Sequence, residues 1–198
     1  MARWEPDARG RLWRAAVDLF VEQGYEATTT AQIAQRAGLT RTTLFRLFPD
    51  KREILFQGQD ALVGSAVEAI GQVPPGAPPV RALAAALAAM AGAHPSDRDG
   101  SRRLTALIAA SPELSERAGA KRVALAAALQ DALRERLGGA RRAGLLADVG
   151  VRAYYDGFDT WIDADEDRPL TACVQEELDR CAHALRDVLG RRPVGAGD

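Results

Sequence analysis

The chain contains 198 residues with a formal net charge of −1 at pH 7, and 47% of the residues are hydrophobic and 27% charged. This composition is typical of a soluble globular protein with one large or two small domains. Apolar runs stay well short of the ~20 residues that span a membrane, and the first residues, MARWEPDARG, lack the apolar core of a secretory signal. We therefore expect a cytoplasmic protein without a membrane partner.

The first periodic segment predicts an amphipathic helix near the N-terminus. Its apolar side chains recur at helical spacing between Leu12 and Phe20. Gly24 marks the end of this helix, because glycine is common just after the last helical turn.

The most informative stretch is residues 29–48, TTAQIAQRAGLTRTTLFRLF. Thr29 and Gln32 form a capping box, in which the hydroxyl and the amide each satisfy a free backbone N–H group at the start of a helix. Gly38 ends that helix, and Thr40 caps the next one. The pattern predicts two short helices that are joined by a tight turn.

The second of these short helices has one apolar side and one polar side. Leu44 and Phe48 lie on the buried side. A pair of short helices with Arg and Thr near the start of the second is the geometry that enters the major groove of DNA. An ordinary helical hairpin with a solvated basic face is the alternative for this segment alone. The residues on the polar face are Arg41, Thr42, Thr43 and Arg46.

The flanking residues favour the DNA-binding interpretation. Pro49 breaks the chain, and Asp50 with Glu53 forms another capping box that opens a helix at Lys51. We expect a three-helix unit that is followed directly by a longer helix. The residues expected in its core are Phe20, Ile33, Leu44 and Phe48.

The rest of the chain is helical in pattern, with no alternation typical of strands. A connecting helix is expected from Asp50 to Ile70, before the proline-rich loop VPPGAPP. Breaks are expected at 94–100, 138–144 and 163–167, and the helix that ends at 137 is either continuous or kinked at Gly119. The helices expected after the proline-rich loop are 80–93, 101–110, 111–137, one capped by Asp148, and 169–189.

Catalytic and metal-binding chemistry is not predicted. His94 and His183 have no second ligand at metal spacing, and no phosphate loop, nucleophile elbow or CxxC motif occurs. Cys173 and Cys181 lie about 12 Å apart on one predicted helix, which is too far for a disulfide within the chain. We expect buried thiols, with a redox link between subunits as the alternative, and no enzyme activity, metal or cofactor.

The balance of charge does not by itself identify a partner. Residues 1–56 hold nine basic and seven acidic side chains, and the remainder is net acidic. Because this asymmetry is small, the placement of the basic groups matters more than their number.

The run GYEATTTAQIAQRAGLTRTTLFRLFPDKREIL, residues 24–55, resembles the N-terminal domain of the tetracycline-repressor (TetR) family of transcriptional regulators. The resemblance covers about the first quarter of the chain. Phe45 stands where the family usually has a tyrosine whose hydroxyl touches a phosphate, and Leu47 stands where a histidine or another aromatic is common. Both differences remove polar contacts to the DNA backbone.

The resemblance implies a sequence-specific transcriptional regulator, a repressor, that binds a pseudo-palindromic operator in double-stranded DNA. Thr29, Thr43 and Lys51 would hold phosphates. The residues that would reach base edges are Arg41, Thr42 and Arg46. The full set of expected DNA-binding residues is Thr29, Arg41, Thr42, Thr43, Phe45, Arg46 and Lys51.

The resemblance also implies a homodimer that is formed by the last two long helices. Proteins that read DNA with one short helix usually bind a two-fold operator as two copies. Gly157 favours a close approach of helices, although the apolar stripes of both helices could instead be buried within one subunit. The expected interface residues are Tyr154, Phe158, Trp161, Leu178, Cys181 and Leu185.

A largely apolar small-molecule effector is what the resemblance implies for the middle helices. Its binding would tilt the connecting helix and release the protein from its operator. The alternative is a DNA-bound protein-interaction factor of the same fold without an effector, which a packed core without a pocket would favour. Residues that could line the cavity, or simply fill a core, are Leu87, Met90, Leu104, Ile108, Leu129 and Tyr155.

We predict an all-α protein. Its expected parts are a helix-turn-helix domain over residues 1–54, a larger helical domain for effector binding and dimerisation over 55–190, and a disordered tail over 191–198.

Overall fold

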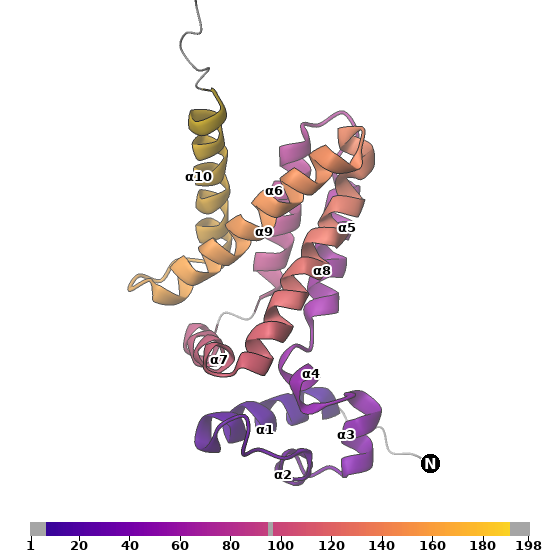
Figure 1. Cartoon of the computed structure of the whole chain (residues 1–198), viewed down its shortest axis with the longest axis vertical. Coiled ribbons are helices and arrows are strands. Elements are labelled where there is room, and N and C mark those ends of the chain that lie inside the picture. Colours follow the sequence, from indigo (N-terminus) through magenta and orange to yellow (C-terminus); the bar gives the residue numbers. More distant parts are fainter. Residues whose placement is uncertain (1–6, 95–96, 191–198) are drawn as a thin grey trace, which may run out of the picture. The chain divides into compact units, whose positions relative to one another are not determined.

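The computed structural model describes residues 7–94 and 97–190, and all regular secondary structure in these residues is helical (Figure 1). This confirms the all-α prediction. The predicted disordered tail, 191–198, lies outside the described residues. The helices are α1 (Ala8–Gln23), α2 (Thr30–Arg36), α3 (Arg41–Leu47), α4 (Lys51–Leu55), α5 (Gln59–Gln72), α6 (Pro79–Ala93), α7 (Arg98–Ala110), α8 (Pro112–Leu137), α9 (Ala140–Asp163) and α10 (Leu170–Gly190).

The chain forms two compact units that are interleaved along the sequence. The N-terminal unit comprises Met1–Asp60 and Asp99–Lys121, and the C-terminal unit comprises Ala61–Arg98 and Arg122–Asp198. The division predicted from the sequence differs from these units, because it places residues 99–121 in the second domain. Most of α7 and the first part of α8 thus fold with the N-terminal helices.

The N-terminal unit has a continuous apolar core. The four expected core residues are all buried, with Ile33 and Leu44 fully inaccessible to solvent. Leu114 of α8 is buried in the same cluster, and Leu104 and Ile108 of α7 pack against it. Burial of this apolar area stabilises the unit by about 25 cal/mol per Å² removed from water. The segment 99–121 is therefore an integral part of the domain that contains the helix-turn-helix.

The helices of the helix-turn-helix region begin at the expected capping residues. One of the two expected capping boxes is incomplete. The Thr29 backbone N–H donates to Gln32 Oε1 at 2.8 Å and the Gln32 backbone N–H to Thr29 Oγ1 at 3.2 Å, which confirms the capping box. Asp50 accepts from the backbone N–H groups of Arg52 and Glu53 at 2.9 and 3.0 Å. The Glu53 carboxylate, however, pairs with Arg117 of α8, so Asp50 caps α4 without a reciprocal box.

The connecting helix expected from Asp50 to Ile70 is interrupted, and that prediction was wrong. Helix α4 ends at Leu55 and α5 begins at Gln59. Gly58, between them, has φ of +87°, a left-handed conformation that ends a helix and that L side chains rarely adopt.

The boundary between α8 and α9 also differs from the sequence prediction, whereas α8 follows the continuous alternative. The break expected at 138–144 is confined to Gly138 and Gly139, both with positive φ, so Gly144 and Asp148 lie inside α9 and Asp148 is not a cap. Helix α8 runs through Gly119 without interruption. The glycines at 119 and 144 are tolerated because packing on neighbouring helices, and not local propensity, determines these long helices.

The C-terminal unit is built on the packing of α10 against α9 and α6 (Figure 1). Gly157 of α9 is buried, and a Cβ at this position would lie 2.7 Å from Val174 Cα of α10. The glycine thus allows close approach of two helices, as expected, but within one subunit. The exposed fraction of Cys173 is 1%, so this thiol is buried as expected, and Cys181 is partly buried.

Candidate nucleic-acid interface

The turn between α2 and α3 is fixed by backbone and side-chain hydrogen bonds. Gly38 has φ of +65°, and the Leu39 backbone N–H donates to the Ala34 carbonyl at 2.8 Å, as in a Schellman motif. The Arg11 guanidinium from α1 donates to the carbonyls of Ala37 and Gly38. These bonds hold α3 at a defined angle to α2.

One side of α3 is open to solvent. Arg41, Thr42 and Arg46 are exposed, and Phe45 is 47% exposed. The Arg41 guanidinium carbon lies 5.9 Å from the centroid of the Phe45 ring, within the range of a cation–π contact. The helix therefore presents Arg41, Thr42 and Arg46 on an accessible face, as the sequence predicts, and adds the ring of Phe45, which the sequence did not place there.

The two threonines expected to hold phosphates differ in their surroundings. Thr29 is exposed at the start of α2, where its hydroxyl takes part in the capping box. Thr43 is half-buried, and its hydroxyl lies 2.9 Å from the hydroxyl of Thr40. Thr40 also caps α3 by accepting from the Thr43 backbone N–H at 3.1 Å.

Lys51 differs from the other expected DNA-binding residues because its ammonium has partners inside the protein. Lys51 Nζ donates to the Tyr25 carbonyl at 2.9 Å and to the Thr28 carbonyl at 3.3 Å. It also lies 4.0 Å from the centroid of the Tyr25 ring. The sequence placed this lysine correctly at the start of α4 but gave no sign of these contacts.

Thr28 is a buried structural residue whose role was not predicted from the sequence. Its side chain is buried, and its hydroxyl donates to the Gly24 carbonyl at 2.8 Å and accepts from the Gln23 side-chain amide at 3.1 Å. The only signal in the sequence is the run of three threonines at 28–30, and nothing in that run distinguishes the buried threonine from the exposed cap that follows it.

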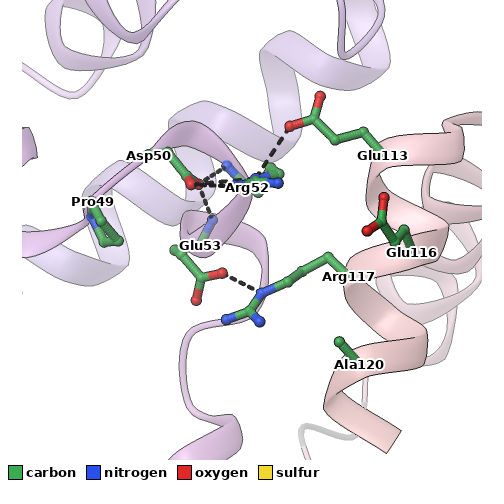
Figure 2. Close-up of a pocket in the computed structure, with 8 residues that line it drawn as sticks. All are labelled: Pro49, Asp50, Arg52, Glu53, Glu113, Glu116, Arg117 and Ala120. Carbon is green, nitrogen blue, oxygen red and sulfur yellow. Dashed lines mark hydrogen bonds and ion pairs between the residues drawn. The ribbon is translucent and has the colours of Figure 1, made fainter.

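A charged cleft of about 440 Å³ lies beside α4 in the N-terminal unit (Figure 2). Arg52 pairs with Asp50 at 2.8 Å and with Glu113 at 3.2 Å, while Glu53 pairs with Arg117. Burial alone would raise the pKa of Asp50, but hydrogen bonds from the Arg52 side chain and the Glu53 backbone hold it below its ordinary value. The lining residues are Pro49, Asp50, Arg52, Glu53, Glu113, Glu116, Arg117 and Ala120.

The residues expected to line an effector cavity are divided between the two units. Leu87, Met90 and Leu129 are buried in the core of the C-terminal unit, and Tyr155 packs against that core. Leu104 and Ile108, the two that come from α7, pack instead against the core of the N-terminal unit. The structure does not bring the six residues into one cluster. This division follows from the assignment of 99–121 to the N-terminal unit.

The residues expected at a dimer interface are mostly part of the subunit's own core. The exposed fractions of Tyr154, Trp161 and Leu178 are 5%, 4% and 2%, and Phe158 and Cys181 are partly buried. Of the six, Leu185 is the most exposed, at 36%. The sequence could not separate these roles, because an apolar stripe has the same periodicity whether it faces the same chain or another.

Residues 12–57 match the sequence profile of the family described as bacterial regulatory proteins, tetR family. The match covers the helix-turn-helix segment, α1 to α4. An uncharacterised HTH-type transcriptional regulator of Mycobacterium tuberculosis is 42% identical over 55 residues, which are 28% of this chain and 29% of the relative. TcmR of Streptomyces glaucescens, an HTH-type transcriptional regulator, is 36% identical over 84 residues, 42% of this chain and 37% of TcmR. The chain thus matches well under half the length of these curated relatives.

Solved structures of TetR-family regulators share the fold over most of the chain. FadR of Thermus thermophilus, described as a transcriptional repressor in complex with lauroyl-CoA, is 23% identical with a TM-score of 0.51 and covers 96% of this chain and 100% of its own. FadR of Bacillus subtilis, in complex with stearoyl-CoA, is 18% identical with a TM-score of 0.59 and covers 87% of this chain and 96% of its own. At these identities the likeness concerns the fold.

Between 7 and 190, apart from 95–96, the structure contains no helix of the length and apolarity that a membrane span requires. The same residues contain no cluster of three or more His, Cys, Asp or Glu side chains that could hold a metal ion.

Proposed function

We propose that the protein is a sequence-specific DNA-binding transcriptional regulator that binds a pseudo-palindromic operator. The observation that carries the proposal is the exposed face of α3, on which Arg41, Thr42 and Arg46 stand in a helix that is capped and firmly packed through Leu44. A short helix of this kind fits the major groove, and an arginine can pair with the O6 and N7 acceptors of guanine. The three residues would read base edges.

The neighbouring residues supply contacts that do not depend on sequence. The hydroxyls of Thr29 and Thr43 are suited to phosphate oxygens, and such contacts position a protein on the duplex without specifying bases. The exposed ring of Phe45 is suited to apolar contact with a sugar or a thymine methyl group.

We also propose that the regulator is a homodimer, with an interface further along α10 than the sequence predicts. Residues 183–190 are all exposed, and Val188 and Leu189 are each 73% exposed. Apolar side chains that remain in water on a helix end are a favourable surface for a second copy. The two helix-turn-helix motifs of one dimer match the two half-sites of a palindromic operator.

We further propose that the protein is a repressor and that a small-molecule effector releases it from its operator. This proposal rests on the fold that this chain shares with regulators named as acyl-CoA complexes. One observation favours the alternative, a DNA-bound interaction factor without an effector: Leu87, Met90 and Leu129 are at most 2% exposed and fill the core. Lauroyl-CoA is a suitable first probe, since a ligand that binds only the folded state raises Tm with its concentration.

The proposed function is tested by selection of the preferred DNA from a random duplex library. We expect a palindromic sequence with two equivalent half-sites and an affinity at least 10³-fold above that for scrambled DNA at the same salt concentration, as is typical of specific regulators. Selection that yields no shared sequence would contradict sequence-specific binding.

A further inference from the structure

The turn between α2 and α3 is bound by Arg11, a residue of α1. The Arg11 Nη2 atom donates to the Ala37 carbonyl and, at 3.3 Å, to the Gly38 carbonyl. These carbonyls follow α2, and the backbone carbonyls at a helix end lack partners within the helix. The helix dipole also favours a cation at this end. Arg11 therefore supplies both hydrogen bonds and a positive charge to the end of α2.

Gly38 is complementary to this guanidinium as well as to the turn. Its φ of +65° is a conformation that glycine adopts without a steric penalty. A Cβ at this position would lie 2.8 Å from Arg11 Nη2, which is closer than real Cβ contacts. The nitrogen thus occupies the space beside the turn that the glycine leaves open, so the position of the turn is coupled to that of Arg11.

The other end of the Arg11 side chain is attached to a well-packed helix, and the turn leads directly into α3. Leu12, the next residue of α1, is fully buried in the core of the N-terminal unit. On the other side, only Leu39 separates Gly38 from Thr40, which caps α3 by accepting from the Thr43 backbone N–H at 3.1 Å. A shift of the turn therefore changes the direction of α3 and of the side chains that it presents.

We propose that Arg11 is a positioning residue for base readout: it sets the direction of α3 and so contributes to sequence specificity. This inference rests on the proposed DNA-binding function. Side chains that read base edges must be held within about 0.5 Å of the productive geometry, whereas non-specific binding depends almost entirely on charge. Loss of the Arg11 hydrogen bonds should therefore weaken binding to the operator more than binding to scrambled DNA.

The ratio of the affinities for operator and scrambled DNA, at one salt concentration and well below Tm, measures this role. The matched control for Arg11→Gln is Arg14→Gln, because Arg14 is on the same helix and its exposed guanidinium pairs with Asp7 at 2.8 Å. Both variants lose one cation. We expect Arg11→Gln to lower the ratio about 10-fold, roughly the value of one good base contact, and Arg14→Gln to leave it unchanged. An unchanged ratio in Arg11→Gln, or an equal fall in both variants, would overturn the positioning role.

The DNA sequence that each variant selects separates positioning from direct reading. Arg11→Gln should relax the preference at several base pairs of each half-site, because all the side chains of α3 shift together. A residue that reads a base relaxes the preference at that base pair only. Relaxation at a single base pair in Arg11→Gln would show that Arg11 reads a base itself, and the positioning role would be wrong.

Arg11→Lys covers the case in which Arg11→Gln does not fold. Lysine keeps the charge, but its ammonium ends one bond short of the position of Arg11 Nη2. We expect the ratio to fall about 3-fold, which is half of the free-energy loss expected for Arg11→Gln. If Arg11→Lys is the only one of the two that folds, a ratio equal to that of the wild type would contradict the proposal.

A measurement without DNA keeps this inference distinct from the proposed function. The backbone amide NMR signals of α3 should shift in Arg11→Gln and stay in place in Arg14→Gln. Unmoved α3 signals in Arg11→Gln would overturn the positioning role whether or not an operator is found. Absence of a shared selected sequence for the wild type would instead contradict the proposed function.

Discussion

Glu53 at the start of α4 is paired with Arg117 of α8, a residue 64 positions later in the chain. Lys121, one turn further along α8, lies 3.9 Å from the same carboxylate. Together with the pair between Arg52 and Glu113, these contacts attach α8 to α4, the helix that follows the helix-turn-helix. The first part of α8 is thus joined to α4 by charge, and Leu114 is buried in the same apolar core as Ile54 and Leu55 of α4.

The pair between Glu53 and Arg117 should contribute measurably to stability. Because the side chains are 20% and 33% exposed, solvent screens part of the attraction, and we expect a coupling free energy of about 0.5–1 kcal/mol. The measurement is a double-mutant cycle with Glu53→Gln and Arg117→Gln in urea. The matched control is the exposed pair of Arg134 and Asp131 on the same helix, whose coupling should be smaller. Equal coupling in the two pairs would contradict this role.

The exposed end of α10 should be required for the dimer. Val188→Glu should produce a folded monomer in sedimentation, because the carboxylate cannot be buried without a partner. Val123→Glu is the matched control, since this valine of α8 is 71% exposed and lies outside the proposed interface. Trp161→Glu should instead lower the free energy of unfolding by several kcal/mol, because Trp161 is in the subunit's core. A Val188→Glu protein that stays dimeric would place the interface elsewhere.

Phe45→Tyr should tighten DNA binding. The added hydroxyl can reach a phosphate oxygen, and one hydrogen bond has a net value of roughly 0.5–1.5 kcal/mol, or about 2- to 10-fold in affinity. The gain should be similar on operator and scrambled DNA, because a phosphate carries no sequence information. Unchanged or weaker binding at fixed salt would mean that the ring makes an apolar contact that the hydroxyl disturbs.

Local signals in the sequence predicted the helix-turn-helix well. The capping box of Thr29, the turn at Gly38 and the burial of Leu44 depend on residues within a few positions of one another. Such interactions are encoded in a short window, so the pattern is readable without the rest of the fold.

Contacts between distant parts of the sequence could not be predicted in the same way. The pairing of Glu53 with Arg117, and the contact of Lys51 with Tyr25, join residues 64 and 26 positions apart. The apolar stripe of α7 indicated burial but not which of two cores would receive Leu104. For the same reason the stripe of α9 did not show that Trp161 packs within its own subunit. Periodicity indicates that a face of a helix is buried, but it does not indicate which element that face packs against.

The reading of base edges by α3 is tested most directly at Arg41. Arg41→Ala should cost about 1–3 kcal/mol on the selected operator and relax the preference at one base pair in each half-site. The affinity for scrambled DNA should change far less at the same salt concentration. The measurement is repeated selection and titration with Arg41→Ala, Thr42→Ala and Arg46→Ala beside the wild type. If none of the three variants alters the preferred sequence, α3 does not read bases.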